Sequence, residues 1–348
     1  MVLPSIALAH GGSTARFDCA CSVTADGRGP YPTIQEGINA GTEGDTVSLC
    51  NGVFRGNGNW DLNFGGKRLC LASLSDDPWS CMIDCGDSSG AHHRGFTFNQ
   101  GEDSTSVVAG ITIANGSTDA QDVGGGIACA TNPYGEASPT IRNVIFRNCS
   151  AGEAGGGFYS SGRSRLRSCL FIDCSALQFG GAIALVHPEV SMNQCTVDAC
   201  SAPTGSGIAI YAYPGWLSVN NTVITNGHGG PAVAGTGVDT VDARCSDVYG
   251  NQGGDWTGPI GGQNGQDGNL SVDPHYCGAT DPQNPYTLWN DSRCAWENNH
   301  CGQIGAYGIG CWNPASTPDF PVPERLALLA IQPNPMRIGA LIRFQLPG

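Results

Sequence analysis

Apolar residues recur through the middle of the chain at an interval of about 25 residues. One series follows a Gly-Gly or Gly-x pair and consists of Ile127, Phe158, Ile183, Ile208 and Val233. A second series consists of Ile113, Phe146, Phe171, Val197, Val223 and Val248. An interval of this length holds two or three short strands with turns between them. The pattern therefore predicts an all-β solenoid in which each interval is one coil of a parallel β-helix.

Small and polar residues repeat with the same interval. Three residues after each member of the second series stands a member of the set Gly116, Cys149, Cys174, Cys200, Asn226 and Asn251. A shorter series consists of Cys169, Cys195 and Asn221. Coils stacked about 4.8 Å apart bring such residues into columns, where asparagine amides can hydrogen-bond from coil to coil. Parallel Cβ bonds at this spacing suit a disulfide poorly, so we expect the cysteines after the second series to be buried thiols, with inter-coil disulfides as the alternative.

The stretch YPTIQEGINAGTEGDTVSLC predicts a short helix followed by a strand. Thr33 and Glu36 have the spacing of a capping box. Ile34 and Ile38 lie on one helical face, and Gly41 can end the helix. An open β-helix exposes unpaired strand edges at its ends, so we expect this helix to cover the first coil.

The same stretch, with GITIANGS, GGGIAC and PTIRNVIFRNCSA further on, resembles the cap and coils of secreted right-handed parallel β-helix proteins of the pectate-lyase-like superfamily. The tract from NLSVDPHYC to GAYGIGC is similar to the closing segment of that group. The resemblance implies a right-handed parallel β-helix over residues 17–312, with a short N-terminal capping helix. In the loop-rich closing tract we expect the disulfides Cys277–Cys294 and Cys301–Cys311.

The two ends of the chain differ from the coils. Residues 1–9 resemble the remnant of a signal peptide, with an apolar N-terminal strand as the alternative. Residues 313–324 read as a proline-rich linker. Residues 325–348 look like the opening strands of the immunoglobulin-like sorting or anchoring modules at the C-terminus of bacterial secreted proteins. With 17 cysteines, typical of an oxidising compartment, these features predict a secreted protein, extracellular or on the outer cell surface.

The charge and hydropathy exclude some partners. The formal net charge is −14, so we expect neither nucleic acid nor an anionic membrane surface as a partner. No apolar run is long enough to span a membrane.

Candidate catalytic residues are few. The resemblance implies acidic Ca²⁺ ligands with an arginine or lysine base in lyases, and several aspartates with a Gly-His-Gly and an Arg-x-Lys in hydrolases. Residues 227–229 are Gly-His-Gly, but Lys67 is the only lysine, so Arg-x-Lys is missing. Asp173 and Asp198 fall at neighbouring positions of successive coils and are candidates for an acid and base pair or a shared Ca²⁺. The alternative is that both are solvated turn residues.

Two further groups suit ligand binding. Asp239, Asp242 and Asp247 are candidate Ca²⁺ ligands in one coil. Arg142 and Arg167 are one interval apart, and stacked guanidinium groups suit the carboxylate or sulfate groups of an acidic glycan. The arginines close to them in sequence are Arg147, Arg163 and Arg165. The alternative is that these charges only balance one another.

Exposed aromatic side chains on a flat sheet can stack on sugar rings. The candidates are Tyr159, Tyr211, Tyr213 and Trp216, which follow the first apolar series or lie in the next turn. The alternative is that these rings pack against inserted loops.

Two functions remain. The missing catalytic motifs favour an exported, non-catalytic β-helix protein with a structural, adhesive or fibre-forming role. Its expected partners are a polysaccharide or further copies of the chain, joined through the ends of the β-helix or the C-terminal strand. The alternative is a polysaccharide lyase or glycoside hydrolase that acts on an acidic polysaccharide. We expect no cofactor, with Ca²⁺ as the one possible exception.

Overall fold

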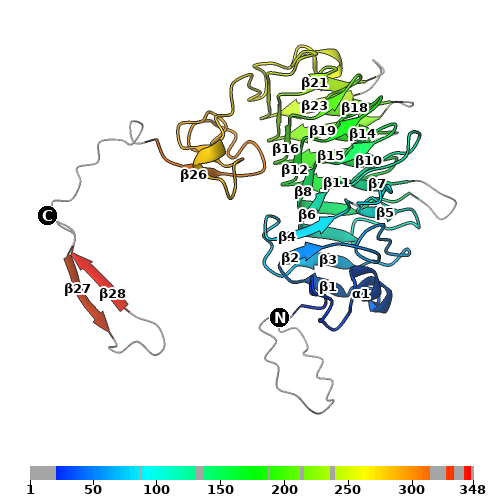
Figure 1. The fold of residues 1–348 in the computed structure, drawn as a ribbon. Helices are drawn as coiled ribbons and strands as arrows, with labels where there is room; N and C mark the ends of the chain where they lie inside the picture. The colour runs from blue at the N-terminus through cyan, green and yellow to red at the C-terminus, as the bar shows by residue number, and fades with distance from the viewer. Residues whose placement is uncertain are drawn as a thin grey trace.

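The computed structural model describes residues 21–86, 88–130, 136–186, 189–211, 215–235 and 240–313, and the backbone of 327–332 and 341–345. Short strands follow one another around an elongated cylinder, and each pairs in parallel with its equivalent in the next coil (Figure 1). One α-helix, α1 (Ile34–Ala40), lies among the described residues. The predicted all-β parallel β-helix with a short N-terminal helix is therefore confirmed.

The first sheet carries the apolar series that follows the glycine pairs. Phe158 is in register with Ile127 and Ile183, and the column continues to Ile208 and Val233. All five side chains are fully buried, as predicted. The sheet consists of β5 (Phe96–Phe98), β7 (Ile127–Cys129), β10 (Phe158–Ser160), β14 (Ile183–Leu185), β18 (Ile208–Ile210) and β22 (Val233–Ala234).

The second and third sheets meet at a corner. β6 (Val107–Ala114) and β8 (Thr140–Arg147) run through both, and they bend at Gly110 and Asn143, whose φ angles are 65° and 51°. The second sheet adds β1 (Thr46–Leu49), β3 (Cys70–Ser73), β11 (Arg165–Arg167), β15 (Glu189–Asn193), β19 (Trp216–Asn220) and β23 (Thr240–Arg244). The third adds β2 (Gly52–Phe54), β4 (Cys81–Asp84), β12 (Leu170–Ile172), β16 (Thr196–Asp198), β20 (Val223–Thr225) and β24 (Asp247–Tyr249).

The second apolar series fills the interior behind the third sheet. Phe146 stacks on Phe171 with ring centroids 4.5 Å apart, and Phe171 is in register with Val197. The next residue in register is Ile224, so the predicted Val223 is wrong by one position. Two apolar residues stand side by side here, and a slip of one residue turns a side chain to the opposite face of a strand.

Each coil leaves the third sheet through a residue in the left-handed conformation. These residues are Asn148, Asp173, Ala199 and Asn226, with φ angles of 53°, 52°, 53° and 55°. The next residue points inward, and the resulting column of buried, free thiols consists of Cys149, Cys174 and Cys200, as predicted. Because of the same one-residue slip, the cysteine columns continue with Gly227 and Thr222 instead of Asn226 and Asn221. A short fourth sheet follows, with β9 (Ser150–Ala151), β13 (Ser175–Ala176), β17 (Ser201–Ala202) and β21 (His228–Gly229).

The N-terminal end of the core is covered by α1, as predicted. The Thr33 side chain accepts a hydrogen bond from the backbone N–H of Glu36, and Ile34 and Ile38 are buried. At the other end of the helix, Lys67 Nζ donates to the carbonyl oxygens of Ile38, Asn39 and Gly41 at 2.8–2.9 Å. A cation at a helix C-terminus stabilises the last turn, where carbonyl groups have no helical partner. The sole lysine of the chain therefore holds the cap in place.

The C-terminal end of the core is also covered. The 3₁₀ helix η1 (Gly258–Ile260) contacts β22 and β23. Ile260 is buried in the main core, and Trp256 packs against that core. Both ends of the stacked coils therefore carry their own covering segments.

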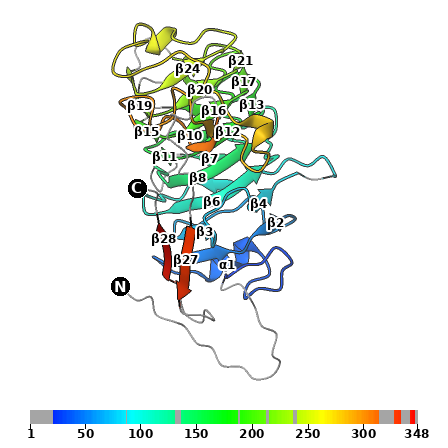
Figure 2. The ribbon, with the colours of Figure 1, turned by 90° about the vertical axis from the view of Figure 1, so that its left-hand side faces the viewer.

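Residues 271–313, here called the closing segment, fold back along the outer side of the third sheet (Figure 2). They include η2 (Gly278–Thr280) and the strand pair β25 (Leu288–Trp289) and β26 (Ile309–Cys311). Tyr286 Oη donates to Asp198 Oδ2 at 2.9 Å, and the Ala306 N–H donates to Thr196 Oγ1 at 2.9 Å. The segment thus lies against β16, about a hundred residues before it in sequence.

The disulfides differ from the predicted ones. The structure joins Cys277 to Cys311 and Cys301 to Cys245, and it also contains the pair Cys21–Cys50. Cys294 is a buried free thiol. The prediction paired cysteines that are close in sequence, whereas the return of the closing segment brings Cys301 to the last coil and the pairing of β25 with β26 brings Cys311 near Cys277.

Beyond the closing segment, β27 (Ala327–Gln332) and β28 (Leu341–Gln345) form an antiparallel pair. Residues 1–9 and 314–324, the predicted signal remnant and most of the predicted linker, lie outside the described residues. Among the residues that the structure describes, no helix is long and apolar enough to cross a membrane.

Candidate functional site

The outer side of the second sheet, from β8 to β23, is here called the open face. Its outward positions are aligned in columns by the parallel register. One column consists of Arg142, Arg167, Asn193, Asn220 and Arg244. The next consists of Thr140, Arg165, Ser191, Ser218 and Asp242. These side chains offer hydrogen-bond donors and acceptors along successive coils.

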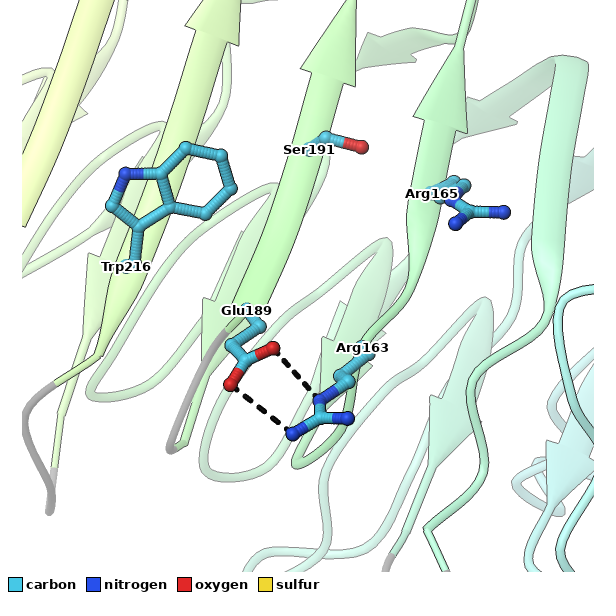
Figure 3. A pocket seen from close by; sticks show the side chains of 5 residues that line it. All are labelled: Arg163, Arg165, Glu189, Ser191 and Trp216. Carbon is cyan, nitrogen blue, oxygen red and sulfur yellow. Dashed lines mark hydrogen bonds and ion pairs between the residues drawn. The ribbon is translucent and has the colours of Figure 1, made fainter.

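A shallow pocket of about 480 Å³ lies on the open face. It is lined by Arg163, Arg165, Glu189, Ser191 and Trp216, which come from three neighbouring strands or the residues just before them (Figure 3). Parallel strands lie about 4.8 Å apart, so side chains one coil apart in sequence meet in this pocket. We treat it as the candidate functional site.

Trp216 forms one wall of the pocket. It stands at the start of β19, in register with Glu189 on β15, and 43% of its surface is exposed. A large exposed indole on a flat polar sheet offers an apolar ring face beside hydrogen-bonding groups, which is the combination that sugar rings stack on.

The opposite wall carries two arginines with different surroundings. Arg163 forms a two-point ion pair with Glu189, with Nε to Oε2 at 2.8 Å and Nη2 to Oε1 at 3.2 Å. Such a paired geometry fixes both side chains. Arg165 forms no ion pair with any described residue. The pocket therefore presents one guanidinium group that is free to bind an anionic or polar ligand.

Arg142 and Arg167 are in register on neighbouring strands, as their spacing predicts. Arg142 Nη1 lies 3.3 Å from Asp76 Oδ1, so its charge is balanced in the way the alternative interpretation expected. Arg167 has no ion-pair partner within the described part of the chain. Arg165 and Arg167 thus place two unbalanced positive charges on the open face of a strongly acidic protein.

The tyrosine candidates lie elsewhere. Tyr159 is on β10 of the first sheet, and Tyr211 directly follows β18 of that sheet. The Tyr211 ring stacks on Phe179 with centroids 4.5 Å apart. Burial raises the pKa of both tyrosines. The two rings are therefore half-buried packing groups outside the pocket, and Tyr213 lies outside the described residues.

The two candidate catalytic aspartates have different environments. Asp198, on β16, is 8% exposed and accepts hydrogen bonds from Thr225, Asn226 and Tyr286 at 2.8–2.9 Å. Asp173 is exposed in the left-handed turn after β12. The two residues are neighbours on successive coils, as predicted, since the Asp173 N–H donates to the Asp198 carbonyl oxygen at 3.3 Å. The carboxylate of Asp198, however, is engaged by three donors and buried at the closing segment, so only Asp173 is open to solvent.

The candidate Ca²⁺ ligands Asp242 and Asp247 lie on different sheets. Asp242 is on the open face, where it pairs with Arg244 at 3.1 Å. Asp247 is on the third sheet, fully buried, and accepts a hydrogen bond from the Val272 N–H at 2.9 Å. Burial raises the pKa of Asp247 to about 7. Asp239 lies outside the described residues, and the described ones contain no group of three His, Cys, Asp or Glu side chains placed to hold a metal ion.

The Gly-His-Gly of residues 227–229 contributes β21 to the fourth sheet. His228 is exposed, and its partner across the fourth sheet is Ser201. Neither candidate aspartate is a strand partner of His228.

Glu189 and Ser191 were not among the predicted site residues. Arg163 and Glu189 are 26 positions apart (189 − 163), about one coil, and their opposite charges were the signal that would have found the pair. Ser191 carries no such signal, because a single hydroxyl on a polar face is common.

The comparisons with known proteins agree with the fold. Residues 88–252 match the family model described as "Right handed beta helix region". No curated protein matches the chain. The matched range holds the coils from β5 to β24. Those coils therefore form a right-handed parallel β-helix.

Proposed function

We propose that this protein is an exported, non-catalytic β-helix protein that binds an anionic glycan on its open face. The observation that carries the proposal is the pocket lined by the exposed Trp216 and by Arg165, which has no ion pair with a described residue (Figure 3). The indole suits the apolar face of a sugar ring, and the guanidinium suits a carboxylate or sulfate substituent.

Export is supported by the cysteines. The described residues contain three disulfides, and disulfides persist in oxidising compartments. A non-catalytic role is supported by Asp198, whose carboxylate is engaged by three donors beneath the closing segment. The covering segments at both ends of the core argue against fibres joined end to end, so the proposal is for binding by single molecules.

Calorimetric titration with polygalacturonate, and with dextran as a neutral polymer, tests the proposal. We expect binding of polygalacturonate that weakens as salt is added. Trp216→Ala is expected to weaken it about tenfold, a loss of about 1.4 kcal/mol. Trp296→Ala is the matched control, because Trp296 is even more exposed, at 58% against 43%, but lies in the closing segment. Equal losses in the two variants, or no binding of either polymer, would contradict the proposal.

The same solutions test the competing function. A polysaccharide lyase or glycoside hydrolase would release unsaturated products or reducing ends from polygalacturonate over hours. If the wild type released such products and Asp173→Ala did not, the function would be catalysis and not binding alone.

A further inference from the structure

The closing segment covers an apolar strip on the outer side of the third sheet. The strip consists of Ile145, Leu170, Ile172 and Val223, all of which are buried. Tyr286, Ala306 and Tyr307 pack on its first three residues, and Leu288 and Ile304 pack on Val223. Ile145, Leu170 and Val223 share one outward column with Thr196, and Ile172 stands two residues after Leu170 on β12. Without this cover the four aliphatic side chains would be exposed on the outside of the sheet.

The contacts that hold the closing segment are poor in one respect. Asn284 Oδ1 and Gln303 Oε1, both in the closing segment, are buried without a hydrogen-bond partner among the described residues. A buried polar atom without a partner is unfavourable, so part of the gain from covering the strip is lost.

The segment also has little regular structure of its own. Its described sheet contacts are the short pair β25 and β26 and the single bridge between Tyr276 and Leu288. Segments with few backbone ladders open more easily than the strands of a packed sheet. A covalent connection therefore contributes much of what keeps the closing segment in place.

That connection is the disulfide Cys245–Cys301, which joins the last coil to the closing segment. Its two cysteines are 56 residues apart in sequence, and a cross-link that closes a long loop stabilises the folded chain more than one that closes a short loop. Of the three disulfides among the described residues, it alone has both cysteines partly exposed. The cysteines of the other two pairs are all buried. Because thiol exchange needs access to a sulfur atom, a reductant reaches Cys245–Cys301 first.

We propose that Cys245–Cys301 is a redox-sensitive latch that releases the closing segment and uncovers the apolar strip. A dithiol reductant attacks the S–S bond, two cysteine thiols form, and the reductant is oxidised to its own disulfide. The coils stay folded, because their interior columns and parallel ladders do not depend on this bond. The proposal is independent of glycan binding on the open face.

Mild treatment of the full chain with dithiothreitol, followed by alkylation and peptide mass spectrometry, tests the order of reduction. We expect Cys245 and Cys301 to be alkylated before Cys277, Cys311, Cys21 and Cys50. Reduction of either buried pair first would overturn the proposal.

Hydrogen exchange and binding of an apolar fluorescent dye test the release itself. We expect exchange to rise at least tenfold across the closing segment and dye fluorescence to rise several-fold, while β12 and β16 stay protected. Cys245→Ser with Cys301→Ser should show the same state without reductant. Cys277→Ser with Cys311→Ser is the matched control, since it removes the bond inside the segment and keeps the latch. The proposal would be contradicted if the closing segment stayed protected in the variant that lacks Cys245 and Cys301. It would also be contradicted if the coils lost protection together with the segment.

Discussion

The open face and the outer side of the third sheet are built from the same coils, yet their outward side chains differ in polarity. On the open face the outward column at β11, β15 and β19 reads Arg165, Ser191 and Ser218. On the third sheet the column at β8, β12, β16 and β20 reads Ile145, Leu170, Thr196 and Val223, with three aliphatic residues and one threonine. The first is left to solvent and ligands, and the second is covered by the closing segment.

This difference separates two roles of the repeat. The inward positions decide that the chain forms a β-helix, because they fill the interior of every coil in the same way. The outward positions decide what each face meets, and they vary from sheet to sheet without disturbing the coil. A β-helix can thus change its binding surface without changing its core.

The largest expected effect comes from exchanging one outward residue on each face. Leu170→Asn places an amide in the covered apolar strip and is expected to lower the free energy of unfolding by about 3 kcal/mol, through lost burial and an unpaired polar group. Ser191→Asn makes the same residue on the open face and is expected to change it by no more than about 0.5 kcal/mol. Urea unfolding of both variants measures the contrast. Equal losses would mean that the two faces are not distinguished by their cover.

The next largest effect is on the pH dependence of stability, which we expect to come from a buried carboxylate on the third sheet and not from one on the open face. Burial raises the pKa of Asp247 to about 7, with further upward contributions from Asp255 and Asp273. The folded state therefore holds a proton that the unfolded state has released, and the free energy of unfolding falls as pH rises from about 4 to about 7. Asp247→Asn removes this fall, so we expect the variant to exceed the wild type by about 2 kcal/mol at pH 8.

Urea unfolding at pH 5 and pH 8 checks this expectation. Asp242→Asn is the matched control, because Asp242 is paired with Arg244 on the open face and is not buried in the same way. The control should keep the pH dependence of the wild type. If Asp247→Asn also keeps it, the buried carboxylate is not its source.

The smallest expected effect on stability comes from Glu189→Gln in the pocket. Exposed ion pairs contribute little, so the free energy of unfolding should change by less than about 0.5 kcal/mol. If the proposed binding is correct, affinity for polygalacturonate should rise several-fold, because the variant removes the one carboxylate among the described residues that line the pocket. Arg165→Gln is the opposing control and should weaken binding. A loss of affinity in Glu189→Gln would show that the carboxylate itself contacts the ligand.

Periodicity predicts most of the coil structure, because interior columns repeat the same residue type. Ile127, Phe158 and Ile183 are in register on neighbouring strands, as their spacing predicted. The prediction slipped at Val223 because its neighbour Ile224 is equally apolar. Pattern alone cannot choose between two such residues, since only the register of the backbone decides which one points inward.

The 25-residue repeat could not predict contacts between distant parts of the chain. Cys245–Cys301 depends on the return of the closing segment, which leaves no periodic signal. For the same reason Asp198 could be placed on its coil, but its hydrogen bond from Tyr286, 88 residues later, could not. In the pocket, Trp216 and the arginines were found from residue type, whereas Glu189 needed the exact length of one coil.

Lys67 gives the molecule an unusual chemical property. Its side-chain amine is the only one in the sequence, and all three of its protons are directed at the carbonyl groups that end α1. Acylation of that amine requires its three hydrogen bonds to the end of α1 to break first. The rate at which Lys67 reacts with an amine-specific label therefore reports how often these bonds between the side chain and the cap open.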